Sequence, residues 1–82
     1  MDFAVSLTTA EKIAACDAAI DQIEPRVYEL ILLVGLDPAT FDGDTYAIPA
    51  GKEDAEGYPV EHELKNRLDA LATVKAHKAS LS

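Results

Sequence analysis

The chain of 82 residues has a single cysteine, no tryptophan and two histidines. One cysteine cannot form an internal disulfide or supply a cysteine-rich zinc site, which excludes two common ways of stabilising a small fold. A chain of this length buries only about 60–65% of the surface that it exposes when unfolded. Small domains without disulfides or metals often depend on oligomerisation. The composition therefore predicts one small domain, residues 1–82, in a reducing compartment, with self-association as a source of stability.

Basic residues and long apolar runs are scarce as well. Seven Lys and Arg stand against fifteen Asp and Glu, for a net charge of −8. Because Lys and Arg drive binding to the phosphate backbone, no direct contact with nucleic acid is expected. The most apolar run, Leu30–Leu36, is far shorter than the roughly 20 residues of a membrane span. Residues 1–12 lack the pattern of a secretory signal. We expect a cytoplasmic protein without a membrane partner, or a virion component if a phage encodes it.

A long amphipathic helix is predicted over residues 8–35. Thr8 and Glu11 have the spacing of a capping box, and Gly35 is a suitable stop. Between them, apolar residues follow the a and d positions of a heptad. This seam comprises Ile13, Cys16, Ile20, Ile23, Val27, Leu30 and Val34. Pro25 predicts a kink rather than a break, because the heptad phase continues across it.

A second helix is predicted over residues 59–79. Its apolar residues have a helical period, and its charges complement the helix dipole at both ends. Residues 36–58 hold several turn signals, and residues 45–48 suit a short strand. The sequence does not decide between a hairpin and an irregular loop there. The predicted fold is mostly α: a long kinked helix, a short loop or small β-hairpin, and a second helix packed antiparallel as a helical hairpin.

The apolar run after Pro25 has more apolar side chains than the seam requires. A helix that is apolar on every side is buried on every side, and one partner helix cannot cover it all. Either residues 36–58 fold over the extra face, or another protein chain does. The second interpretation is favoured, because interface cores are rich in aromatic residues. The predicted partner interface comprises Tyr28, Ile31, Leu32, Leu33, Phe41 and Tyr46.

An acidic surface is predicted from the residues that connect the helices. It comprises Asp42, Asp44, Glu53, Asp54, Glu56 and Glu61. The first three occupy positions 1, 3 and 12 of a calcium-binding loop. The match fails at Tyr46, where an oxygen ligand is required, and at Ala47, where the loop needs glycine. A solvated acidic loop is therefore the better interpretation, and no metal or cofactor is predicted.

No catalytic group is predicted either. Cys16 lies in the seam, where a cysteine behaves as a small hydrophobic residue. A nucleophilic cysteine needs a base within reach, and nothing in the sequence places His62 or His77 beside it. The chain is therefore not expected to be an enzyme.

Charge is distributed unevenly along the chain, with −7 over residues 36–63 and +3 over residues 64–82. One interpretation is head-to-tail association, in which the acidic loop of one subunit faces the basic end of the next. The other is that the basic residues pair with acids of the first helix in the same chain. Both stay open for Lys65, Arg67, Lys75 and Lys78.

The layout resembles that of the small head–tail joining proteins of tailed phages. The resemblance rests on an alanine-rich first helix (residues 11–20), a Gly- and Tyr-bearing connection (residues 42–48) and a Leu-rich second helix (residues 63–68). It implies a helix–hairpin–helix subunit that forms a ring in a virion neck. No functional residue carries over.

Two functions compete. The first is a structural or assembly protein that works as a homo-oligomer or within a larger complex. The second is an acidic inhibitor or immunity-type protein that blocks a basic, nucleic-acid-binding partner through its acidic surface, since complementary charge speeds association.

Overall fold

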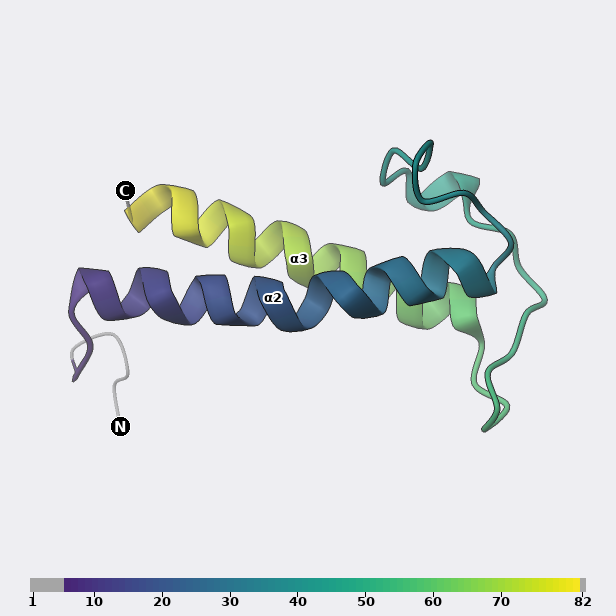
Figure 1. The fold of residues 1–82 in the computed structure, drawn as a ribbon, viewed down its shortest axis with the longest axis horizontal. Coiled ribbons are helices and arrows are strands. Elements are labelled where there is room, and N and C mark those ends of the chain that lie inside the picture. Colours follow the sequence, from purple (N-terminus) through teal and green to yellow (C-terminus); the bar gives the residue numbers. More distant parts are fainter. Residues whose placement is uncertain (1–5, 82) are drawn as a thin grey trace.

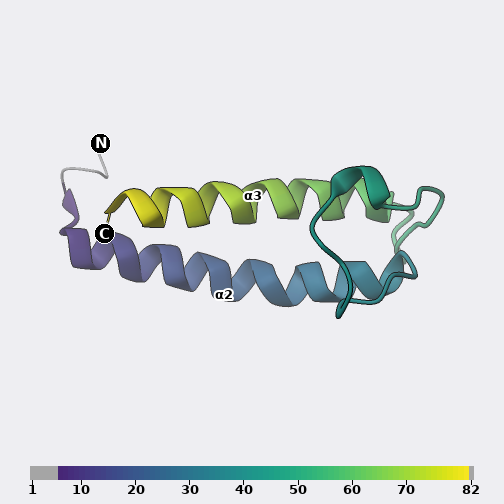
Figure 2. The same ribbon diagram turned by 90° about the horizontal axis from the view of Figure 1, so that it is seen from above.

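In the computed structural model, residues 6–81 are described, and they form a hairpin of two long helices (Figure 1). Helix α2 spans Thr9–Leu33 and helix α3 spans Val60–Leu81, with a short 3-10 helix, η1, at Thr45–Ala47 between them. The helices lie side by side, with the start of α2 and the end of α3 at the same end of the hairpin (Figures 1 and 2). The predicted helical hairpin is confirmed, with helix ends within two residues of those expected. Residues 1–5, part of the segment judged above to lack a secretory signal, lie outside the described residues.

Local sequence signals fix both ends of α2. The Thr8 hydroxyl accepts a hydrogen bond from the Glu11 amide, and the Glu11 carboxylate accepts one from the Thr8 amide, both at 3.1 Å. At the other end, the Leu36 amide donates to the Ile31 carbonyl and the Gly35 amide to the Leu32 carbonyl. This is a Schellman motif, which requires the positive φ of +87° at Gly35. The helix runs through Pro25 as one element and bends gently in Figure 2.

The core lies at the end of the hairpin where the connection joins the helices. Leu30 and Leu64 are completely buried there, one from each helix. The buried cluster comprises Val27, Leu30, Ile31, Val34, Val60 and Leu64. Farther along the hairpin, the predicted seam and facing residues Ile13, Ile20, Leu71 and Val74 are only half-buried. Burial of the apolar stripe therefore falls from the connection toward the chain ends.

The connection is irregular rather than a β-hairpin. Residues 45–48, which suited a strand, instead form η1 and its C-cap, because the Asp44 carboxylate accepts a hydrogen bond from the Tyr46 amide and starts a helical turn. Among the described residues the only strand-like pairing is an isolated antiparallel bridge between Glu53 and Pro59. Leu36, Phe41 and Ile48 pack against the buried cluster, so part of the connection covers the core. Figure 2 shows this segment crossing over the two helices.

The hairpin is elongated. Its principal extents are 43 × 27 × 18 Å, and its radius of gyration is 15.0 Å. A compact domain of this length has a radius of gyration of about 12 Å. Each helix can cover only one side of the other, so much of the surface of both helices faces solvent.

Candidate functional site

Three apolar side chains near the end of α2 remain exposed. Tyr28 is 59% exposed, Leu32 52% and Leu33 45%. Tyr28 and Leu32 are four residues apart and are therefore neighbours on the helix surface. Leu33 lines a cleft on another side of the helix. We call these three residues the exposed apolar cluster; neighbouring exposed apolar side chains are typical of contact sites.

The predicted partner interface divides into two groups. Tyr46 is 97% exposed, so it is accessible surface like the three residues of the exposed apolar cluster. Ile31 is only 5% exposed, so the expectation that it lies outside the core of the hairpin is wrong. It follows Val27 by four residues, which places it on the edge of the buried stripe. Phe41 is half-buried and packs against the same core. Ile31 and Phe41 are therefore covered by other residues of the same chain.

The six residues of the predicted acidic surface lie in or next to the connection. Asp42, Asp44, Glu53 and Glu56 are exposed, whereas Asp54 and Glu61 are half-buried. One carboxylate oxygen of Glu61 is covered without a hydrogen-bond partner. None of the six forms an ion pair within residues 6–81.

Some of these acids also shape the connection. The Asp42 carboxylate accepts a hydrogen bond from the Asp44 amide at 2.8 Å. The Asp54 carboxylate accepts from the Glu56 and Tyr58 amides, both at 2.9 Å. The bonds to the Asp44 and Glu56 amides, two residues on, are Asx-type turns, in which the side chain replaces a backbone acceptor. The acidic residues therefore fix the path of the chain as well as its charge.

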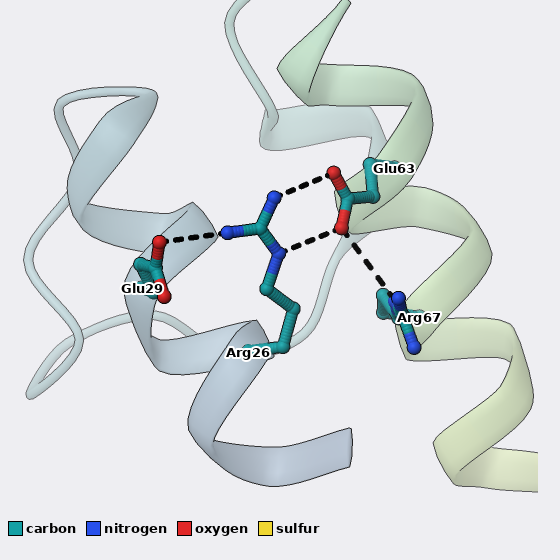
Figure 3. Close-up of polar contacts among 4 residues, drawn as sticks. All are labelled: Arg26, Glu29, Glu63 and Arg67. Atoms are coloured by element: carbon teal, nitrogen blue, oxygen red, sulfur yellow. Dashed lines mark hydrogen bonds and ion pairs between the residues drawn. The ribbon is translucent and has the colours of Figure 1, made fainter. Parts of the chain in front are cut away.

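Arg26 organises a cluster of ion pairs between the helices, shown in Figure 3. Its Nε and Nη2 atoms donate to the two carboxylate oxygens of Glu63 at 2.7 and 2.8 Å, and its Nη1 donates to Glu29 at 2.7 Å. Arg67 approaches the same Glu63 oxygen at 3.7 Å. The bidentate geometry is the strongest form of an arginine–carboxylate pair. It joins α2 to the first turn of α3.

The Arg26 cluster shifts the ionisation of its members. Hydrogen bonding to Arg26 lowers the pKa of Glu63, against the opposing effect of desolvation. The same bond raises the pKa of Arg26. Both charged forms are therefore stabilised. A cleft of about 500 Å³ beside this pair is lined by Arg26, Glu29, Leu33, Glu53, Asp54, Ala55, Glu56 and Glu63. Five of those eight residues are acids, so the cleft favours cations or basic side chains.

The chain-end part of the hairpin has a groove of a different character. It measures about 480 Å³ and is lined by Leu7, Lys12, Ala15, Cys16, Ala19, Thr73, Val74, His77 and Leu81. Cys16 is buried, as its seam position predicts. His77 lines the same groove, a proximity that the sequence did not show, but no hydrogen bond joins it to Cys16 within the described residues. Most of the lining is apolar or small, so the groove suits an apolar occupant.

The basic residues of α3 pair largely within the chain. Lys78 lies 2.6 Å from Asp17 and Lys75 lies 3.7 Å from Glu24, both acids of α2. Arg67 pairs with Glu63 of its own helix. Lys65 forms no ion pair with any other described residue. Pairing with acids of the first helix, the second of the two interpretations above, therefore accounts for Lys75 and Lys78 but not for Lys65 or Arg67.

Sequence reasoning did not single out Arg26. Its only local signal is Glu29 three residues later, a common spacing on helix surfaces. Its main partner, Glu63, comes from the other helix, and this pairing depends on the register between the two helices. That register follows from the path of the connection, which sequence patterns did not determine.

No group of three or more potential metal ligands comes together within residues 6–81. Neither long helix, over its described residues, combines the length and hydropathy needed to cross a membrane. Comparison with protein-family models, curated proteins and solved structures gives no match to this chain.

Proposed function

We propose that this chain is a non-enzymatic structural or assembly protein that acts through protein–protein contacts. The observation that carries the proposal is the exposed apolar cluster of Tyr28, Leu32 and Leu33 on the best-packed part of the molecule. The apolar side chains lie on a helix that is already ordered in the folded chain. Binding through them therefore costs little additional conformational entropy. A larger complex can bury these side chains without rearranging the hairpin.

The specific form of this proposal is a component of a phage virion neck or connector, present as an oligomer. Its support is the resemblance in layout of helix, short connection and helix. In that setting the protein resides in the cytoplasm and then in the assembled virion.

The proposal is tested by the native mass of the particle and by site-specific cross-linking. A particle isolated from its source under native conditions is expected to exceed the 8.8 kDa of one chain. A photo-activatable residue in place of Leu32 is expected to form an adduct with another polypeptide. The matched control replaces Asn66, an exposed polar residue of α3, and should form none. A native mass of one chain, or equal adducts at both positions, contradicts the proposal.

One observation favours a second candidate, the acidic inhibitor or immunity-type protein. The acidic surface has no internal ion pairs among the described residues, and three of its members, Glu53, Asp54 and Glu56, line the cleft beside Arg26. Unpaired acids on a fixed scaffold can attract a basic partner and speed its association.

Neutralising the acidic surface tests this candidate. Asp→Asn at positions 42, 44 and 54 keeps an acceptor oxygen for each turn, and Glu→Gln completes the set at positions 53, 56 and 61. Binding to a basic nuclease should be salt-sensitive in the natural chain and lost in the neutralised one. If neutralisation leaves that binding unchanged, the inhibitor function is wrong.

A further inference from the structure

The cleft beside Arg26 is continuous with the exposed apolar cluster. Its volume of about 500 Å³ lies within the range of ligand-binding clefts, about 300–1,000 Å³. Leu33, which is 45% exposed, lines the cleft together with Ala55. Because Leu33 also belongs to the exposed apolar cluster, a protein that contacts the cluster reaches the edge of the cleft. The two features therefore form one surface.

Helix α2 sets the arrangement of this surface. Arg26, Glu29 and Leu33 are three and four residues apart, so they follow one another along one face of the helix and line the cleft. Glu29 also precedes Leu32 by three residues, which makes these two side chains neighbours on the helix surface. The Glu29 side chain is 60% exposed. A side chain that enters the cleft past Leu32 or Leu33 therefore meets a carboxylate.

The charge of the cleft is not balanced by the residues around it. Five acids and one base line it, for a net charge of −4, and Arg67 reduces this to −3 because it approaches Glu63 at 3.7 Å. Arg26 is already bonded to Glu63 and Glu29, as Figure 3 shows. The three remaining acids form no ion pair with any described residue: Glu53, Asp54 and Glu56. A concave site lined by one sign of charge attracts groups of the opposite sign.

An arginine side chain matches this combination of acids and apolar wall. The acids are distributed along the cleft, and no three of them come close enough together to hold a metal ion. A guanidinium group is planar and can bond to separate carboxylates, as Arg26 itself does with Glu63 and Glu29. The methylene stem of an arginine can pack on Leu33 and Ala55 while its charged end meets the acids.

A second copy of the chain cannot supply this arginine without losing an existing contact. The sequence has two arginines, Arg26 and Arg67, and both already pair with Glu63. Two copies, each with a net charge of −8, would also repel each other. The occupant that fits is therefore a different protein.

We propose that the cleft is the docking site for an arginine side chain of another protein, whose neighbouring apolar side chains pack on the exposed apolar cluster. The guanidinium bonds to the acids that have no ion pair, and its stem lies on Leu33. The inference rests on the proposed function, because it names the chemistry of the partner at the same contact surface. It differs from the inhibitor candidate, because it requires one arginine beside apolar side chains and not a basic surface opposite all six acids.

The experiment titrates the full chain with the blocked dipeptide acetyl-Leu-Arg-amide at constant ionic strength, up to about 50 mM, a range suited to the affinity of one side chain. Backbone amide signals are followed by NMR, and shifts are expected at Glu29, Leu33 and Ala55. Acetyl-Leu-citrulline-amide has the same shape without the charge and should bind at least about tenfold more weakly. Acetyl-Leu-Lys-amide keeps the charge without the planar fork and should bind at least about threefold more weakly.

Two double variants separate the cleft from the charge of the whole chain. Glu53→Gln with Glu56→Gln removes two carboxylates from the cleft and should weaken binding of acetyl-Leu-Arg-amide at least about fivefold. The matched control combines Asp21→Asn with Asp69→Asn, which are exposed acids of α2 and α3 that do not line the cleft. It removes the same amount of charge, and its effect should stay within about twofold because salt screens distant charges.

Several results would overturn the inference. These are the absence of shifts at the cleft up to about 50 mM, equal binding of the arginine and citrulline dipeptides, and equal weakening by the two double variants. Equal binding of the lysine dipeptide would assign the cleft to cations in general and overturn it as well. None of these results alters the adduct at Leu32, which tests the proposed function. Conversely, arginine-dependent shifts in a chain that forms no adduct at Leu32 would contradict the proposed function and leave the preference of the cleft for arginine intact.

Discussion

The closed half of the hairpin, residues 23–69, and the terminal half, residues 6–22 and 70–81, share the same two helices but differ in packing and charge. In the closed half, both helices and the connection contribute to one buried cluster, and Arg26 links α2 to α3 through two hydrogen bonds. In the terminal half the same helical faces are only half-covered, and the interhelix ion pair of Lys78 with Asp17 is exposed. The closed half has a net charge of −7, and the terminal half, with three acids and three bases, has a net charge of zero. A third covering segment, present in one half alone, accounts for the difference in packing.

This comparison shows how a two-helix protein can divide its roles. The covering segment supplies Phe41 and Ile48 to the core, and the connection to which it belongs also holds six of the eleven acids of the closed half. Apolar packing and negative charge are therefore both concentrated in the closed half. Within the described residues, the other end has no third segment over its two helices and no excess of either charge. Substitutions that separate the two halves test this division directly.

The largest expected effect is the loss of a core leucine in the closed half. Leu30→Ala leaves a cavity in the buried cluster and should lower the free energy of unfolding by about 2–5 kcal/mol. A chain of this size has a total stability of only about 4–12 kcal/mol, so this loss is a large fraction of it. The matched variant in the terminal half, Val74→Ala, removes a half-buried side chain and should cost about 1 kcal/mol or less. Urea denaturation followed by circular dichroism compares the two. Equal losses of unfolding free energy in the two variants would contradict the difference in packing between the two halves.

The next effect concerns the Arg26–Glu63 pair. Glu63→Gln removes the charge from a part-buried, bidentate pair and should lower the free energy of unfolding by about 1.5–3 kcal/mol. Glu29→Gln is the control, because Glu29 bonds to the same guanidinium but is 60% exposed. Its cost should be about 0–1 kcal/mol.

The same pair predicts a pH dependence. The pKa of Glu63 is lowered in the folded chain. Its stabilising contribution is therefore fully present above the pKa of the unfolded chain and is lost as the pH falls through the folded value. Denaturation at pH 7 and at progressively more acidic pH should show a loss of stability that is smaller in Glu63→Gln. A variant with an unchanged acid profile would show that this pair does not contribute.

A smaller effect is expected at Gly35, where the closed half begins to turn back. Its φ of +87° is unfavourable for L-residues, and no atom lies within 4 Å of an added Cβ. Gly35→Ala should therefore cost about 1 kcal/mol from backbone conformation alone. Gly35→Asn should cost less, because asparagine tolerates the left-handed region. Thermal unfolding ranks the three chains, and an equal cost for both variants would contradict this cause.

Local features of the fold were predictable from the sequence, because their signals and partners lie close together in the chain. The Thr8 capping box, the stop at Gly35 and the heptad seam are of this kind. Ile31 was misplaced because the buried stripe was taken to be the a and d positions of the heptad, which leave Ile31 out. A stripe that includes the position four residues after Val27 would have predicted its burial.

The candidate surfaces were predictable only in part. Leu32 and Leu33 follow from an apolar run that is too wide for one partner helix, and their exposure agrees with that argument. The groove of the terminal half left no signal, because its alanines are also ordinary helix-forming residues. The pairing of Arg26 with Glu63 depends on the register between helices. Each of these features depends on how distant segments align, which short-range patterns do not encode.

The smallest expected effect lies in the terminal half, at the pair of Lys78 and Asp17. The atoms are 2.6 Å apart, but both side chains are at least 40% exposed, so water and salt screen their attraction. A double-mutant cycle with Lys78→Gln and Asp17→Asn measures the coupling. It should be weaker than that of Arg26 with Glu63, and it should decline further as salt is added. The pKa of Lys78 is raised in the folded chain by its hydrogen bond to Asp17. Its contribution is therefore present below the unfolded pKa and is lost as the pH rises through the folded value. A coupling as strong and as salt-resistant as that of the Arg26 pair would mean that electrostatics holds both halves equally, leaving apolar packing as their only difference.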